Sequence, residues 1–117
     1  MGKPLGPYTP IVRSGDWLVV SGQLGLKDGA LVEGGVAAQA RQAVANLSDL
    51  LAGEGASLSD VVKTTVFLTD MDDFTAMNEA YMAAFGDARP ARSTIGVAAL
   101  PLAGAVVEIE AWARHSA

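Results

Sequence analysis

The sequence predicts an α+β domain in which two helices cover one face of a mixed β-sheet. Two segments place apolar residues at the spacing of an amphipathic helix, and each lies between short runs rich in β-branched residues, which are typical of strands. The predicted order is ββαβαββ, over a single domain of residues 1–117. Because each helix connects two strands, both helices are expected to pack on the same face of the sheet.

Five segments are predicted to be strands. Residues 11–13 and 17–21 flank the turn Ser14-Gly15-Asp16 and form a hairpin. The glycine-rich stretch from Gly22 to Gly35 is expected to be a loop. The remaining strands are predicted from their density of β-branched residues, over 61–68, 93–98 and 105–113.

Two helices are predicted from apolar periodicity. The first begins at Val36, is closed by Gly53 and Gly55, and repeats apolar residues along one face. Those residues are Val36, Ala40, Ala43, Val44, Leu47, Leu50 and Leu51. The second is capped by Asp70 or Asp72 and ends at Gly86. Its apolar face comprises Phe74, Met77, Tyr81 and Phe85.

The composition predicts self-association. Hydrophobic residues make up 50% of the chain and charged residues only 18%, which indicates more apolar surface than one copy can hide. Neither side of the strand over 61–68 is strongly polar, so the sheet is expected to be buried on both faces. A closed homo-oligomer would cover the face that the helices leave free.

Charge and residue usage argue against several classes of function. A net charge of −5 with only 8 basic residues disfavours a general nucleic-acid binder. The absence of Cys excludes thiolate catalysis and thiolate metal sites, and no His pair has metal-ligand spacing. No long apolar run or leader-like segment occurs, so no membrane partner is predicted and the cytoplasm is the expected location.

Arg92 is the most informative single residue. Pro90 ends the preceding helical pattern, so Arg92 is expected near the start of a strand bordered by apolar segments. A charge in such a place is tolerated only when paired, and the planar guanidinium suits a carboxylate bidentately. Whether that carboxylate belongs to the protein or to a ligand is left open by the sequence.

Glu108 and Glu110 are the candidate carboxylates. They alternate with Val107 and Ile109, so they share one side of a strand with Trp112. In one interpretation this side is the solvated face of an edge strand. In the other, one of the two carboxylates faces Arg92 across a cleft.

Four further residues are weaker candidates. Ser21 and Gly22 follow an apolar strand, where glycine permits close backbone approach and serine offers a hydroxyl, although this pair often marks only a turn. Tyr8 lies between two prolines that stiffen its segment. Asn78 interrupts a helix, where it is either exposed or bonded to a neighbouring loop.

The motifs taken together resemble the Rid (RidA/YjgF) family of imine deaminases. The resemblance runs from about Gly6 to Ala113 with the motifs in order. They are Gly6-Pro7-Tyr8-Thr9-Pro10, Val20-Ser21-Gly22-Gln23, Val66-Phe67-Leu68-Thr69-Asp70-Met71, Pro90-Ala91-Arg92-Ser93-Thr94, Leu100-Pro101 and Glu108-Ile109-Glu110.

The resemblance implies a chorismate-mutase-like fold assembled as a homotrimer, with sites in the clefts between subunits. It implies that Arg92 clamps a substrate carboxylate and that Glu108 positions the attacking water, with no metal or cofactor. Residues implied to complete the pocket are Tyr8, Ser21, Gly22, Asn78 and the backbone of Thr94. The implied reaction converts 2-imino acids such as 2-iminobutyrate and 2-iminopropionate, and their enamine tautomers, to 2-keto acids and ammonia.

The chain departs from the family pattern in three places. The segment before Gly6 is very short, Thr94 stands where well-known members carry Cys, and Gly96 replaces a charged residue. Two other functions stay open: a non-catalytic trimer that binds 2-keto acids as a sensor or interaction module, and a ribonuclease, which the acidic balance disfavours.

Overall fold

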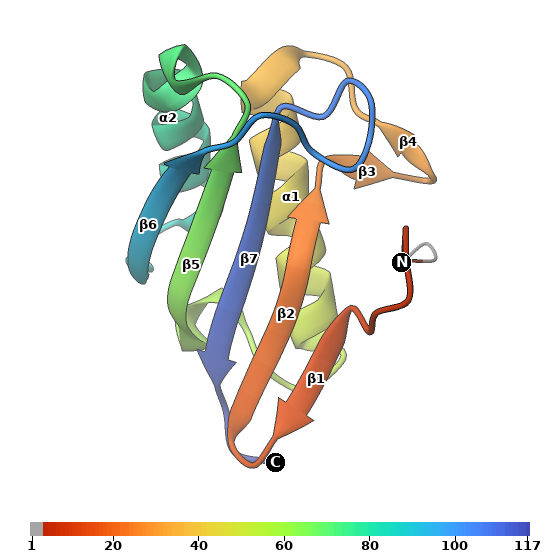
Figure 1. The fold of residues 1–117 in the computed structure, drawn as a ribbon. Coiled ribbons are helices and arrows are strands. Elements are labelled where there is room, and N and C mark those ends of the chain that lie inside the picture. The colour runs from red at the N-terminus through yellow and green to blue at the C-terminus, as the bar shows by residue number, and fades with distance from the viewer. Residues whose placement is uncertain (1–3) are drawn as a thin grey trace.

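The computed structural model describes residues 4–117 and consists of a sheet covered on one side by two helices (Figure 1). The five strands of the main sheet run in the spatial order β1-β2-β7-β5-β6. Their bounds are β1 Ile11–Ser14, β2 Trp17–Leu24, β5 Val61–Leu68, β6 Ala91–Gly96 and β7 Val107–Arg114. The predicted order ββαβαββ is confirmed for this sheet and its helices.

The last strand of the chain occupies the middle of the sheet. β7 pairs antiparallel with β2 on one side and with β5 on the other, and β1 pairs antiparallel with β2. Only β5 and β6 run parallel, and the helix α2 (Phe74–Phe85) connects them. A parallel pair needs such a crossover, because a tight turn can join only antiparallel neighbours. Because β6 pairs only with β5 among the described residues, it is an edge strand, whereas β7 has a partner strand on both sides.

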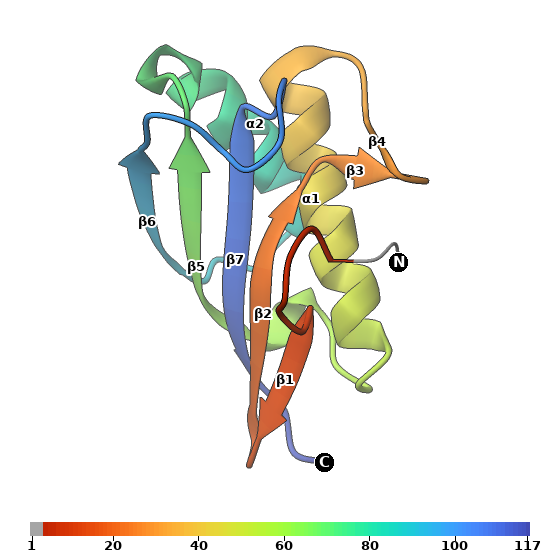
Figure 2. The same cartoon turned by 45° about the vertical axis from the view of Figure 1, so that its right-hand side comes forward.

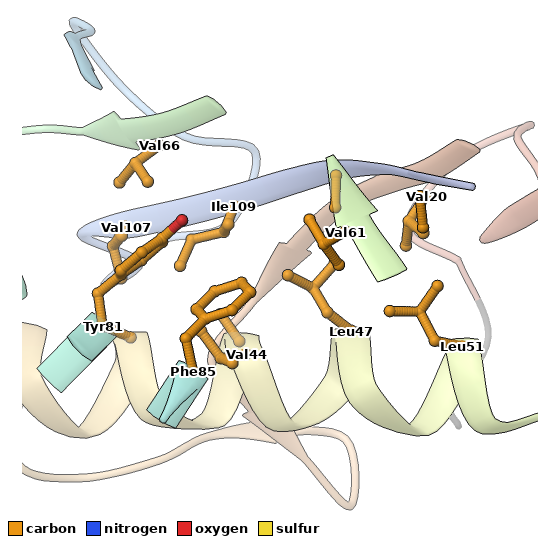
Figure 3. Packing of buried hydrophobic residues seen from close by; sticks show 14 of the residues in the cluster. Val20, Val44, Leu47, Leu51, Val61, Val66, Tyr81, Phe85, Val107 and Ile109 are labelled. Atoms are coloured by element: carbon orange, nitrogen blue, oxygen red, sulfur yellow. The ribbon is translucent and has the colours of Figure 1, made fainter. Parts of the chain in front are cut away.

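Both helices pack on the same face of the sheet, as predicted. Figure 2 shows α1 (Gly35–Ala52) and α2 together behind the strands. The core lies between the two layers, where alternate residues of β7 meet apolar side chains of both helices (Figure 3). Val107 and Ile109 are completely buried there. Strand alternation consequently directs the residues between them to the opposite face.

The face without helices exposes several large apolar side chains. Val12, Ile95 and Trp112 are 48%, 45% and 47% exposed. By register, Val12 lies in one row with Val19 and Trp112. Ile95 lies in another row with Phe67 and Glu108. Glu108, Glu110 and Thr65 lie on the same face, so apolar and polar side chains share it. Burial of this face by another copy stays a prediction.

The prediction of a loop over 22–35 is wrong. β2 continues to Leu24, and a small hairpin follows, formed by β3 (Leu26–Lys27) and β4 (Ala30–Leu31). Asp28 and Gly29 join these strands with φ values of 53° and 83°. Two consecutive residues with positive φ give a tight hairpin turn, and Asp-Gly is a favoured pair for it.

Two short 3₁₀ turns adjust the predicted boundaries. One spans Leu58–Asp60 before β5, and the other spans Met71–Asp73 before α2. The Asp70 carboxylate accepts a hydrogen bond from the Asp72 backbone N–H at 2.9 Å, so it caps the 3₁₀ turn rather than the α-helix. β6 begins at Ala91, two residues earlier than predicted, and β7 begins at Val107, two residues later.

Two buried amides of α1 fix the strand ends near the candidate carboxylate. Gln39 donates from Nε2 to the Gly104 carbonyl at 3.1 Å and accepts the Val106 N–H at Oε1 at 2.9 Å. Asn46 donates from Nδ2 to the Leu24 and Leu26 carbonyls at 3.1 and 2.9 Å. The start of β7 and the end of β2 are therefore both tied to one helix.

Within residues 4–117, no helix combines the length and the hydropathy that crossing a bilayer requires. The same residues contain no group of three or more His, Cys, Asp and Glu side chains arranged to hold a metal ion.

Gly25→Ala should destabilise the protein by about 1–3 kcal/mol, because the added methyl group overpacks the contact between α1 and the residue that follows β2. A Cβ at Gly25 would lie 2.6 Å from Gln39 Cα, which is backbone and cannot rotate away. Thermal unfolding measures the change. Gly53→Ala is the control, since its Cβ would lie 3.5 Å from the Leu50 carbonyl oxygen, an ordinary van der Waals contact. A Gly25→Ala variant that melts with the wild type would contradict this packing.

Candidate functional site

Arg92 projects from the edge strand β6 toward α2. Its Nη2 donates to Asn78 Oδ1 at 2.7 Å, and its Nη1 lies 3.9 Å from the Met77 sulfur. The guanidinium carbon lies 4.9 Å from the centre of the Tyr81 ring and 5.7 Å from that of Phe74. The helix supplies this set because residues at positions i, i+4 and i+7 share one face.

All these partners of Arg92 are neutral. Within the described chain, no carboxylate forms a salt bridge with it, and the two salt bridges found join Arg13 to Glu54 and His115 to Asp60. The side chain is half-buried. A half-buried guanidinium without a counterion favours the binding of an anion, and a carboxylate fits its fork bidentately. The protein does not supply that carboxylate from the same copy.

Asn78 and Thr94 lie beside Arg92. Asn78 is the hydrogen-bond partner just described, and Thr94 follows Arg92 by two residues on the same side of β6. The Val97 N–H donates to the Leu68 carbonyl of β5. Amides alternate in direction along a strand, so the Thr94 N–H points to the open edge of the sheet. It is a free donor close to the guanidinium.

Glu108 lies on the other face of the sheet, against Gly22. A register shift between Val20 and Gln23 marks a bulge in β2 at this point. A Cβ on Gly22 would lie 2.6 Å from the Glu108 carboxyl carbon, so only glycine leaves room for the carboxylate in this position. The interpretation of Glu108 as part of a solvated edge strand is wrong, because β7 lies between β2 and β5.

Burial raises the pKa of Glu108 above its usual value, and the neighbouring Glu110 charge raises it further. The interpretation in which Glu108 faces Arg92 across a cleft does not hold within one copy, and burial and Glu110 are the causes of this pKa shift. An ionised Glu108 with a raised pKa is a stronger base than an exposed glutamate.

Ser21 fastens the N-terminal segment beside Glu108. Its Oγ donates to the Thr9 carbonyl at 2.7 Å, and its N–H donates to the Pro10 carbonyl at 2.8 Å. Tyr8 is thereby held near Gly22, and both line a pocket of about 930 Å³. Tyr8 itself is 44% exposed.

The candidate residues form two groups that one copy cannot bring together. Arg92, Asn78 and Thr94 lie on the helix side at the edge of the sheet, whereas Glu108 lies with Gly22 on the free side. β5 separates their strands (Figure 1). From the register, the Cα atoms of Arg92 and Glu108 are about 14 Å apart, on opposite faces. We refer to these two groups as half-sites, because each holds only part of the predicted site.

Comparison with known proteins places the chain in a family. The family model described as Endoribonuclease L-PSP matches residues 2–115. The chain belongs to the endoribonuclease L-PSP (RidA/YjgF) family. This confirms the resemblance found in the motifs.

Individual relatives support the same assignment. A mouse protein named 2-iminobutanoate/2-iminopropanoate deaminase is 47% identical over 111 residues, which cover 93% of this chain and 82% of the relative. RidA from an Antarctic Psychrobacter species superposes with a TM-score of 0.90 at 41% identity, covering 96% of this chain and 91% of that one. Escherichia coli TdcF with bound serine gives 0.89 at 36% identity, covering 97% and 91%. The α+β fold of the family is therefore confirmed.

Sequence reasoning missed two residues of the Arg92 surroundings in this RidA/YjgF family member. Tyr81 was predicted only as core, and Thr64 only as part of a strand, yet their hydroxyls bond each other at 2.7 Å beneath the guanidinium. The spacing of Phe74, Asn78 and Tyr81 along one helical face was the available signal for Tyr81. Thr64 could be found only from the register of β5 with β6.

Glu110→Gln should lower the pKa of Glu108, because it removes the neighbouring negative charge while burial remains. An NMR titration of the glutamate side-chain carboxyl carbons measures the change. Glu33→Gln, an exposed site before α1, is the control and should leave the Glu108 titration unchanged. An unchanged Glu108 pKa in Glu110→Gln would show that the two carboxylates do not interact.

Proposed function

We propose that this protein is an imine deaminase that hydrolyses 2-imino acids to 2-keto acids and ammonia. The observation that carries the proposal is the half-buried Arg92 guanidinium, which has neutral partners only and lies at an open sheet edge. A 2-imino acid brings the missing carboxylate and, next to it, an electrophilic C=N carbon. The name of the mouse relative supports the same reaction.

The active form that we propose is a homotrimer in which each site takes Arg92 from one copy and Glu108 from another. Two features support it. The helix-free face presents apolar side chains in the row of Glu108, Phe67 and the exposed Ile95, which a subunit interface would cover. The two half-sites lie on opposite faces, so no rearrangement within one sheet would join them.

In the proposed mechanism, Arg92 holds the substrate carboxylate while Asn78 orients the guanidinium. Glu108 accepts a proton from water as the water oxygen bonds to the carbon of the protonated imine. The proton then passes from Glu108 to the nitrogen of the carbinolamine, the C–N bond breaks, and the hydroxyl proton leaves with ammonia as ammonium. Tyr8, Ser21, Gly22 and the Thr94 N–H line the site.

Two other functions are weaker. The family description names an endoribonuclease, but a net charge of −5 disfavours attraction to RNA. A trimer that binds 2-keto acids without turnover would use the same Arg92, so binding and turnover have to be measured separately.

Arg92→Ala should lower kcat/KM for 2-iminobutyrate at least about 100-fold, because the substrate carboxylate loses a charged bidentate partner. The imine is generated in place by an amino-acid oxidase, with semicarbazide as the competing trap. Arg41→Ala, an exposed arginine of α1, is the matched control and should keep wild-type activity.

The assay separates the alternatives when it is paired with calorimetry of pyruvate binding. Wild type that is no faster than buffer rules out the deaminase, and pyruvate binding that depends on Arg92 then identifies a binding protein. Arg92→Ala with wild-type activity would refute the carboxylate clamp.

A further inference from the structure

We propose that Tyr81, held by Thr64, is a positioning residue that fixes the plane of the Arg92 guanidinium for carboxylate binding. The inference deepens the proposed function and rests on it. Its basis is geometric: the guanidinium carbon lies 4.9 Å above the Tyr81 ring, and the Tyr81 hydroxyl bonds Thr64 Oγ1 at 2.7 Å.

The Tyr81 ring is a rigid support. The side chain is only 4% exposed, and Thr64 is completely buried. Phe85 packs against Tyr81 with ring centres 4.5 Å apart. Figure 3 shows Tyr81 and Phe85 rising from α2 toward the sheet, with the Tyr81 oxygen directed at the strands. Both ends of the ring are thus fixed before any ligand arrives.

Thr64 and Arg92 meet the same ring because they are register partners in the parallel pair of β5 and β6. Thr64 bonds the hydroxyl at the tip of the ring, and Arg92 covers its face. Asn78 occupies Nη2 of the guanidinium from the side. Tyr81 contacts the flat face of the guanidinium and Asn78 contacts its edge, so the cation is held in one orientation. Its remaining N–H donors are left for the ligand.

Tyr81 must stay neutral to act in this way. A phenolate beside Arg92 would pair with it and compete with the substrate carboxylate. Burial raises the pKa of Tyr81, and this exceeds the lowering by the Thr64 hydrogen bond and by the Arg92 charge. The ring therefore attracts the cation through its π face without supplying a competing counterion.

A fixed guanidinium loses less conformational entropy on binding than a mobile one. Loss of the ring should therefore weaken binding of the carboxylate more than it slows the chemical step. A purely structural Tyr81 would instead affect stability without this separation of KM from kcat.

The test measures pyruvate binding by calorimetry, and KM and kcat with 2-iminobutyrate. All measurements use the assembly that the protein forms in solution. Tyr81→Leu should raise Kd for pyruvate and KM about tenfold, with kcat changed less than about threefold. Tyr81→Phe keeps the ring and Thr64→Val removes only its tether, so each should raise Kd about two- to threefold. This graded series remains informative if Tyr81→Leu does not fold.

Leu51→Val is the control, because it shortens a fully buried side chain of α1 that contacts neither the Tyr81 ring nor Arg92. It should lower the melting temperature and leave Kd and KM unchanged. The inference is overturned if Tyr81→Leu binds pyruvate like the wild type or if Leu51→Val weakens binding equally. If Tyr81→Leu does not fold, the inference is overturned when Tyr81→Phe and Thr64→Val both bind like the wild type. Any of these results with an active wild type leaves the proposed deaminase intact. An inactive wild type refutes the deaminase, and the Kd values for pyruvate then decide alone whether Tyr81 positions Arg92.

Discussion

The alternation of side chains along β7 is the constraint on which the rest of the structure depends. Val107 and Ile109 must face the helices to complete the core, so Glu108 between them must face the other way. Arg92 lies on the helix-covered side, because α2 provides its partners. A shift of one residue in the register of β7 would move Glu108 to the other face, but it would also expose the core. The separation of the two charges is therefore built into the fold.

This separation leaves each half-site of the described chain with a partly desolvated charge that has no opposite charge beside it. Among residues 4–117, the half-buried Glu108 forms no salt bridge and lies next to Glu110, and the half-buried Arg92 forms no salt bridge either. The free sheet face also exposes Ile95 and Trp112. A second copy against that face would cover the apolar surface and bring opposite charges together around a substrate. Tyr81 and Asn78 contact the Arg92 guanidinium, and Gly22 leaves room for the Glu108 carboxylate.

Periodicity predicted most of the fold, since both helices and the strand Val61–Leu68 follow strong local patterns. The hairpin at Asp28-Gly29 was missed because its strands are only two residues long and carry no periodic signal. The shared side of Glu108 and Glu110 followed from alternation. The face of the sheet on which Arg92 lies could not be predicted, because an edge strand exposes both of its faces. The Thr64–Tyr81 contact could not be predicted either, because it depends on a register that only the assembled sheet defines.

The most direct test of the central claim is complementation between two inactive variants, Arg92→Ala and Glu108→Gln, unfolded together in equal amounts and refolded. If each site combines Arg92 of one copy with Glu108 of another, random trimers contain about a quarter of sites with both residues intact, and deaminase activity should return to that fraction of wild type. Each variant refolded alone is the control. Activity that never exceeds that of the separate variants, in mixed trimers verified by mass spectrometry, would contradict a site shared between copies.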